Sequence, residues 1–153
     1  MQYYQEIIVA LTAMAPLSEL RGALPLAIGV FHFSPVKAFL VSVIANAVPP
    51  FFIILLMEWI TKRLMRFTWW NGFFTRLFNH TREKFRGDYE RWGELALVIF
   101  VAIPLPATGA WSGALAAWLF GIPMKRAVPL IALGVAIAGL IVLGLTQGVA
   151  ALI

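Results

Sequence analysis

Two charged residues, Glu19 and Arg21, stand in the otherwise apolar segment "PLSELRGALP", between Pro16 and Pro25. A carboxylate in such a segment can bind and release a proton, because burial disfavours its charged form while a neighbouring guanidinium favours it. Arg21 can orient Glu19 or attract an anionic group. A structural alternative stays open, in which the two residues form an ion pair that only holds the fold together.

A second group of polar and helix-breaking residues lies in "IPLPATGAWSG", residues 103–113. Hydroxyl groups in broken helices either contact a substrate or satisfy backbone groups that the break has freed, and both interpretations stay open for Thr108 and Ser112. Trp111 can line a cavity or simply fill space. We predict Glu19 and Arg21 as transport and proton-coupling residues, within a substrate cavity formed by Pro16, Ser18, Pro25, Pro104, Pro106, Thr108, Gly109, Trp111 and Ser112.

The composition is that of an integral membrane protein, with 61% hydrophobic and 12% charged residues among 153. The chain has no cysteine, which excludes thiol catalysis and thiolate metal sites. Its two histidines, His32 and His80, are isolated and lack metal-ligand spacing. No Ser-His-Asp or metal-binding constellation is visible, so we expect neither an enzyme nor a bound cofactor or metal. The basic residues form a short cluster that topology explains, and we expect no nucleic-acid partner.

Two segments are long enough and apolar enough to cross a bilayer. The run from Ala38 to Met57 holds 20 uncharged residues, which at about 1.5 Å each match a hydrocarbon core of about 30 Å. Pro49 and Pro50 predict a kink within it. The last apolar segment, Ala127 to Ile153, is also uncharged. We predict transmembrane helices over residues 36–60 and 124–150.

Two further apolar regions, residues 7–33 and 95–124, are interrupted at their midpoints by the two polar segments. A continuous helix would place proline-rich backbone, and in the first region two charges, at the centre of the bilayer. The limbs on either side of each interruption are about half a membrane long. We therefore predict two re-entrant helical hairpins, over residues 5–33 and 93–121, whose polar tips meet inside the protein.

The two halves of the chain correspond to each other at an offset of 88 residues. This offset pairs Glu6 with Glu94, Pro16 with Pro104, Pro35 with Pro123, and Lys37 with Lys125. A unit of one hairpin and one spanning helix crosses the membrane once, so its copy starts on the opposite side. We predict an all-α fold with an inverted repeat, residues 3–60 and 93–153, in a single membrane domain over 1–153.

The linker over residues 61–92 carries eight basic residues. The positive-inside rule places it in the cytoplasm, which leaves both termini extracytoplasmic. Phe67, Trp70 and Phe74 recur at helical spacing, which favours an amphipathic helix on the membrane surface in contact with lipids.

The stretches "SELRGALPLAIG" and "PLPATGAWSGALAAWLFG" resemble the two signature stretches of the putative small multidrug export protein family, a prokaryotic group. That family is similar to the DedA and VTT-domain superfamily, which is associated with two re-entrant hairpins and with proton-linked transport or lipid flipping. The resemblance implies a prokaryotic inner-membrane location and functional positions at Glu19 and Arg21. DedA-type members usually carry arginines near the second hairpin, whereas this chain has none between Arg91 and Lys125.

The leading hypothesis is a secondary-active transporter that exports small amphipathic molecules and is proton-linked through Glu19. One alternative is a lipid flippase or scramblase in which Arg21 holds a phosphate. Another is a membrane assembly or homeostasis factor that transports nothing. The expected partners are lipids, a small amphipathic substrate and protons. Two spanning helices and two hairpins are few to enclose a transport path through the membrane, so the alternative of a homodimer stays open.

Overall fold

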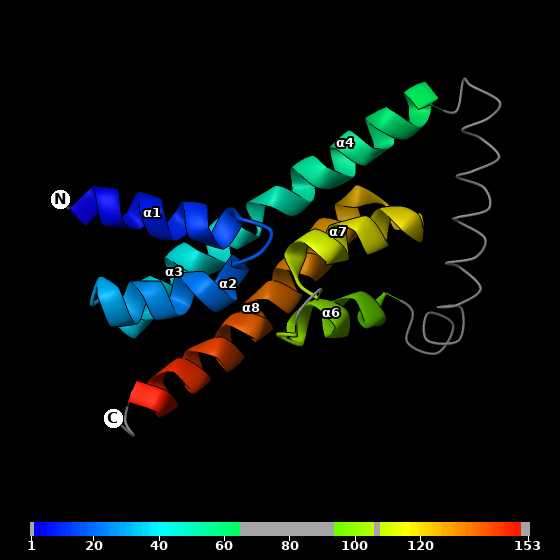
Figure 1. The fold of residues 1–153 in the computed structure, drawn as a ribbon. Helices are drawn as coiled ribbons and strands as arrows, with labels where there is room; N and C mark the ends of the chain where they lie inside the picture. Colours follow the sequence, from blue (N-terminus) through cyan, green and yellow to red (C-terminus); the bar gives the residue numbers. More distant parts are fainter. Residues whose placement is uncertain (1, 65–93, 106–107, 151–153) are drawn as a thin grey trace.

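The structure is a computed structural model that describes residues 2–64, 94–105 and 108–150, and every regular element in these ranges is helical. The all-α prediction is therefore confirmed for this part of the chain. Figure 1 shows two pairs of short helices arranged around two long helical paths. The first pair is α1 (Gln2–Met14) and α2 (Glu19–Pro25), with α2 continued by a π-helical turn, η1 (Leu26–Val30). The remaining elements are α3 (Pro35–Asn46), α4 (Val48–Leu64), α6 (Leu95–Ala102), α7 (Ala110–Leu119) and α8 (Met124–Ala150).

Two helical stretches are long and apolar enough to cross a membrane. One covers Pro35–Arg63, which comprises α3 and nearly all of α4, and the other covers Met124–Val149 in α8. They agree with the spans predicted over residues 36–60 and 124–150. The first stretch is interrupted at Ala47, just before Pro49 and Pro50. Prolines are tolerated in the first turn of a helix, where their missing N–H groups would have no intrahelical partner, so a new helix begins here.

Each short pair turns near the middle of the molecule. In Figure 1, α1 runs inward from the N-terminal end and α2 returns towards it, while α6 and α7 do the same from the opposite end. The bends lie in the two segments where the sequence predicts them. The backbone has a positive φ at the end of each bend, 45° at Glu19 and 134° at Gly109. Ser18 secures the first bend, because its hydroxyl donates to the carbonyl oxygen of Thr12 at 2.6 Å.

The order of elements in the first half recurs in the second. Helix α1 ends at Met14 and α6 ends at Ala102, 88 residues later, while the starts of α3 and α8 are within one residue of the same spacing. That the halves form an inverted repeat, and that the pairs fold back inside a membrane, stays a prediction. The linker predicted over 61–92 begins in α4, and its residues from 65 onward lie outside the described ranges.

Corresponding ion pairs lie at the outer parts of the two halves. Glu6 of α1 contacts Lys37 in the first turn of α3 at 2.5 Å, and Glu94 contacts Arg126 in the first turn of α8 at 2.9 Å. The two acids correspond under the 88-residue offset, whereas the basic partner in the second half is Arg126 rather than Lys125. In each half, this ion pair links the first short helix, near its beginning, to the beginning of the long helical stretch, which starts with α3 in the first half and is α8 in the second.

Small residues allow α6 to pack closely between its neighbours. A methyl group at Gly113 of α7 would lie 2.5 Å from Cγ2 of Val101, and one at Gly134 of α8 would lie 2.7 Å from its Cβ. Val101 is buried in the apolar core at this contact. Helix–helix packing in membranes depends on such close approach, because there is no hydrophobic driving force between helices in lipid.

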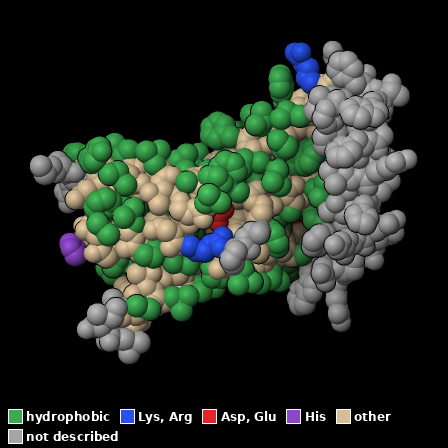
Figure 2. All heavy atoms as spheres, viewed as in Figure 1, with side chains coloured by type: hydrophobic (Ala, Val, Ile, Leu, Met, Phe, Trp, Pro, Cys, Tyr) green, Lys and Arg blue, Asp and Glu red, His purple; other side chains and the backbone are tan. Residues whose placement is uncertain are grey.

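The outer surface is also apolar. Figure 2 shows many hydrophobic side chains on the viewed face, with a basic and an acidic group near its middle and a further basic group at its upper right. Leu40, Phe52, Leu140 and Leu145 are each at least 50% exposed. Exposed apolar surface of this extent is covered by a membrane or by a partner.

Candidate functional site

Glu19 is the one charged residue among the buried residues of the described part, with 4% of its surface exposed. It is the first residue of α2, and its carboxylate lies at the beginning of α7. Oε1 accepts a hydrogen bond from the backbone N–H of Trp111 at 3.3 Å, and the backbone N–H of Ala110 also donates to the carboxylate. The first N–H groups of a helix have no intrahelical acceptor and carry a partial positive charge. Glu19 therefore acts as the N-terminal anion of a helix from the other half.

Gly109, the residue before α7, makes room for this contact. Its φ of 134° is a backbone conformation that L side chains rarely adopt. A methyl group on Gly109 would also overlap the carboxylate, lying 2.7 Å from Cδ of Glu19 and 2.8 Å from Oε1. Only glycine meets both requirements at this position.

Arg21 links the carboxylate to the second bend. Its Nη2 lies 3.4 Å from Oε2 of Glu19 and donates to the carbonyl oxygen of Thr108 at 2.7 Å. The contact with the carbonyl is the shorter one and has ordinary hydrogen-bond length, whereas the contact with the carboxylate is long. The side chain of Arg21 is 29% exposed and that of Glu19 is 6% exposed. The guanidinium therefore approaches from the edge of the site, while the carboxylate lies inside it.

The other polar side chains at the bends bind backbone groups that the breaks have freed. The indole N–H of Trp111 donates to the carbonyl oxygen of Met14, the last residue of α1, at 3.0 Å. The hydroxyl of Thr108 lies 2.5 Å from the carbonyl oxygen of Ile103, and that of Ser112 donates to the carbonyl oxygen of Gly109 at 3.3 Å. These hydrogen bonds all stabilise the bends, because they supply partners to backbone carbonyl groups there.

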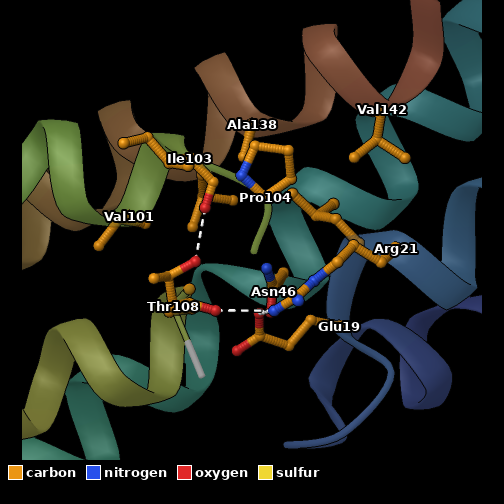
Figure 3. A pocket seen from close by; sticks show the side chains of 13 residues that line it. Glu19, Arg21, Asn46, Val101, Ile103, Pro104, Thr108, Ala138 and Val142 are labelled. Atoms are coloured by element: carbon orange, nitrogen blue, oxygen red, sulfur yellow. Dashed lines mark hydrogen bonds and ion pairs between the residues drawn. The ribbon is translucent and has the colours of Figure 1, made fainter. Parts of the chain in front are cut away.

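A small cavity lies where the two bends meet (Figure 3). Its volume is about 10 Å³, which is room for one water molecule. Of the predicted site residues, Glu19, Arg21, Pro104, Thr108 and Gly109 line it. Pro16, Ser18, Pro25, Trp111 and Ser112 do not line it, and Pro106 lies outside the described residues. The roles of all these residues in transport stay predictions.

Asn46, the last residue of α3, also lines the cavity, although the sequence did not place it there. It is 1% exposed, and its Oδ1 has no hydrogen-bond partner among the described residues. Ser42, four residues earlier and fully buried, has an unpartnered hydroxyl in the same part of the chain. Two polar residues four apart share one helix face, and this spacing within an apolar run is the signal that could have identified the position.

The remaining lining residues are apolar, and nothing in the sequence distinguishes them from other residues of the core. They are Leu20, Val101, Ile103, Ala110, Val135, Ala138 and Val142. Among the described residues, no group of three or more His, Asp or Glu side chains could hold a metal ion.

Residues 19–141 match the family described as "Putative small multi-drug export protein". No curated protein and no solved structure matches the chain. The similarity to the DedA and VTT-domain superfamily stays a prediction. The matched region starts at Glu19 and includes both sides of the cavity, and together with the two long apolar helices it indicates a membrane protein. Because the match covers far more than half of the 153 residues, the chain belongs to the family with this description.

Proposed function

We propose that the protein is a secondary-active membrane transporter that exports small amphipathic molecules and is coupled to protons through Glu19. The family description names multi-drug export, which supports a role in transport. The observation that carries the proposal is the position of Glu19. A buried carboxylate at the junction of two halves, held by Trp111 and Arg21, is the group whose protonation would alter that junction.

In this proposal, the two short helix pairs are re-entrant hairpins in an inverted repeat. Helix α6 has 8 residues and α1 has 13, which at about 1.5 Å each makes them about 12 and 20 Å long, too short to cross a core of about 30 Å. The recurring element order and the two corresponding ion pairs support the repeat. The distribution of basic residues supports a linker in the cytoplasm and both termini outside. The resemblance to a prokaryotic family supports a prokaryotic inner membrane.

Transport requires the bends to separate, because the cavity has room for only one water molecule. Separation breaks the bond from the backbone of Trp111 to Glu19 and the bond from Arg21 to Thr108. Hydrogen bonds to a charged carboxylate are about twice as strong as those to a neutral acceptor. Protonation of Glu19 therefore weakens the closed junction, and this links proton binding to opening.

The test is transport by the purified protein in liposomes. With an amphipathic fluorescent dye as probe, the wild type should move dye in response to a pH gradient, and Glu19→Gln should lose that response. Glu6→Gln is the matched control, because it removes a paired carboxylate of the same half that does not line the cavity. An unchanged gradient response in Glu19→Gln would remove Glu19 from the mechanism.

A lipid flippase or scramblase is the second candidate. It is favoured by the 29% exposure of the Arg21 side chain, since a guanidinium that reaches the surface can bind a phosphate group. Redistribution of a fluorescent phospholipid in the same liposomes distinguishes the two functions. Lipid movement that is lost in Arg21→Gln and insensitive to the pH gradient would favour this candidate. If neither dye nor lipid moves, the protein is a membrane assembly factor in which the charged pair is structural.

A further inference from the structure

The cavity beside Glu19 is lined by several hydrogen-bond acceptors, and the positively charged side chain that lines it is that of Arg21. Its walls include the carboxylate of Glu19, the residue Thr108 whose carbonyl oxygen binds Arg21, and the amide of Asn46. The Oδ1 of Asn46 is buried and accepts no hydrogen bond within the described ranges. A buried acceptor without a partner costs free energy, and such an atom in a native structure calls for a donor that binds there.

The guanidinium of Arg21 satisfies the other acceptors from the edge of the site. It donates to the carbonyl oxygen of Thr108 at 2.7 Å and lies 3.4 Å from Glu19. Glu19 is anchored independently, because the backbone of Trp111 donates to its other oxygen. Arg21 can therefore withdraw through its exposed side without breaking the bond between Glu19 and the backbone of Trp111.

We propose that this cavity is the binding site for an amphipathic cation whose headgroup carries N–H groups, such as an alkylguanidinium or alkylammonium ion. The headgroup takes the place of the Arg21 guanidinium on Glu19 and on the carbonyl oxygen of Thr108, and donates a further hydrogen bond to Oδ1 of Asn46. Arg21 is then a built-in competitor that occupies the site when no substrate is bound. This inference rests on the proposed function and names its substrate class.

The walls disfavour the opposite charge. An anion could contact Arg21, but it would lie beside the carboxylate of Glu19 and would bring no donor to Oδ1 of Asn46. The rest of the lining suits an alkyl chain, because Leu20, Val135 and Val142 face the same cavity. A quaternary ammonium ion has the charge but no N–H group, so it separates the effect of charge from that of hydrogen bonding.

The experiment measures binding of three probes with the same tail to the full-length protein in lipid nanodiscs. They are decylguanidinium, decyltrimethylammonium and decyl sulfate, titrated by calorimetry against empty nanodiscs. We expect decylguanidinium to bind at least about tenfold more tightly than decyltrimethylammonium, because the quaternary headgroup cannot donate a hydrogen bond to Glu19, Thr108 or Asn46. Decyl sulfate should show only the partitioning seen in empty nanodiscs.

Variants assign the preference to residues. Asn46→Leu should reduce the preference for decylguanidinium, and Ser42→Ala should leave it unchanged, since Ser42 is equally buried and unpartnered on α3 but does not line the cavity. Arg21→Gln should tighten decylguanidinium binding, because the competitor is gone. If Asn46→Leu does not fold, the probe preference of the wild type and the effect of Arg21→Gln on decylguanidinium binding still test the proposed site.

Equal affinities for the two cations, or an unchanged preference in Asn46→Leu, would overturn the inference. So would specific binding of decyl sulfate that Arg21→Gln abolishes. The titrations use no pH gradient, so they are independent of transport. If the protein shows the predicted preference but moves no dye, the proposed function is wrong and this binding site stands. If it transports dye without the preference, the binding site is wrong and the proposed function stands.

Discussion

Replacing Gly109 with alanine should destabilise the protein more than any other single methyl addition to a glycine considered above. The backbone at Gly109 has a φ of 134° and a ψ of −164°, a region that is essentially restricted to glycine and costs about 1–3 kcal/mol for other residues. The added methyl group would also overlap the carboxylate of Glu19. Loss of that anion from the beginning of α7 adds about 0.3–1 kcal/mol. The expected destabilisation is therefore about 1–4 kcal/mol.

Gly144→Ala is the matched control for this change. Gly144 lies within α8, and a methyl group there would meet nothing within 4 Å. Alanine should stabilise this helix by up to about 1 kcal/mol, because it loses less conformational freedom than glycine on folding. Unfolding in mixed micelles of increasing denaturing-detergent content, followed by circular dichroism, measures both variants under identical conditions.

A double variant separates the two contributions at Gly109. In a Glu19→Ala background, the carboxylate is absent, so Gly109→Ala should cost only the backbone part, about 1–3 kcal/mol. Strict additivity would show that the methyl group does not disturb Glu19. If Gly109→Ala is no more destabilising than Gly144→Ala, the described geometry of the second bend is wrong.

Three further changes each test one contact of the structure, two near the bends and one at the outer part of the second half. Trp111→Phe keeps an aromatic ring but frees the carbonyl oxygen of Met14, so it should lower the unfolding free energy by about 0.5–1.5 kcal/mol in the same detergent assay. Gly113→Ala places a methyl group 2.5 Å from Val101 and should cost about 1–3 kcal/mol, a loss that Val101→Ala in the same chain should partly restore. Glu94→Gln breaks an ion pair whose basic partner is 67% exposed, so it should change stability by less than about 1 kcal/mol, and less still at high salt.

The sequence was sufficient for the class of protein and for the location of the two bends. The apolar composition and the two uncharged runs predicted the long helices, and the proline and glycine residues marked where the short helices end. These features are local, because a helix breaker acts within a turn or two of its position. The kink predicted from Pro49 and Pro50 is found as a break at Ala47 for the same reason.

The contacts between the bends were beyond the reach of sequence analysis. The sequence suggested Arg21 as the partner of Glu19, whereas the hydrogen bonds to the carboxylate also come from the backbone at the start of α7, about 90 residues away. Every residue type except proline supplies a backbone N–H, so no side chain in the sequence marks this partner. Asn46 is one polar residue in an apolar run, and its place in the cavity depends on how α3 packs against α2 and α8.

The role of Glu19 in holding α7 and its proposed role in proton coupling are compatible, because one contact can serve both. A glutamine at position 19 still offers a carbonyl oxygen to the backbone of Trp111, so Glu19→Gln should lose only the electrostatic part of the interaction, about 0.3–1 kcal/mol. A purely structural carboxylate would therefore leave a nearly stable and fully active protein after this change. A coupling carboxylate would leave a protein that is equally stable but no longer responds to the pH gradient. The comparison of stability with transport in Glu19→Gln thus distinguishes the two interpretations, whereas a larger truncation at this position would confuse them.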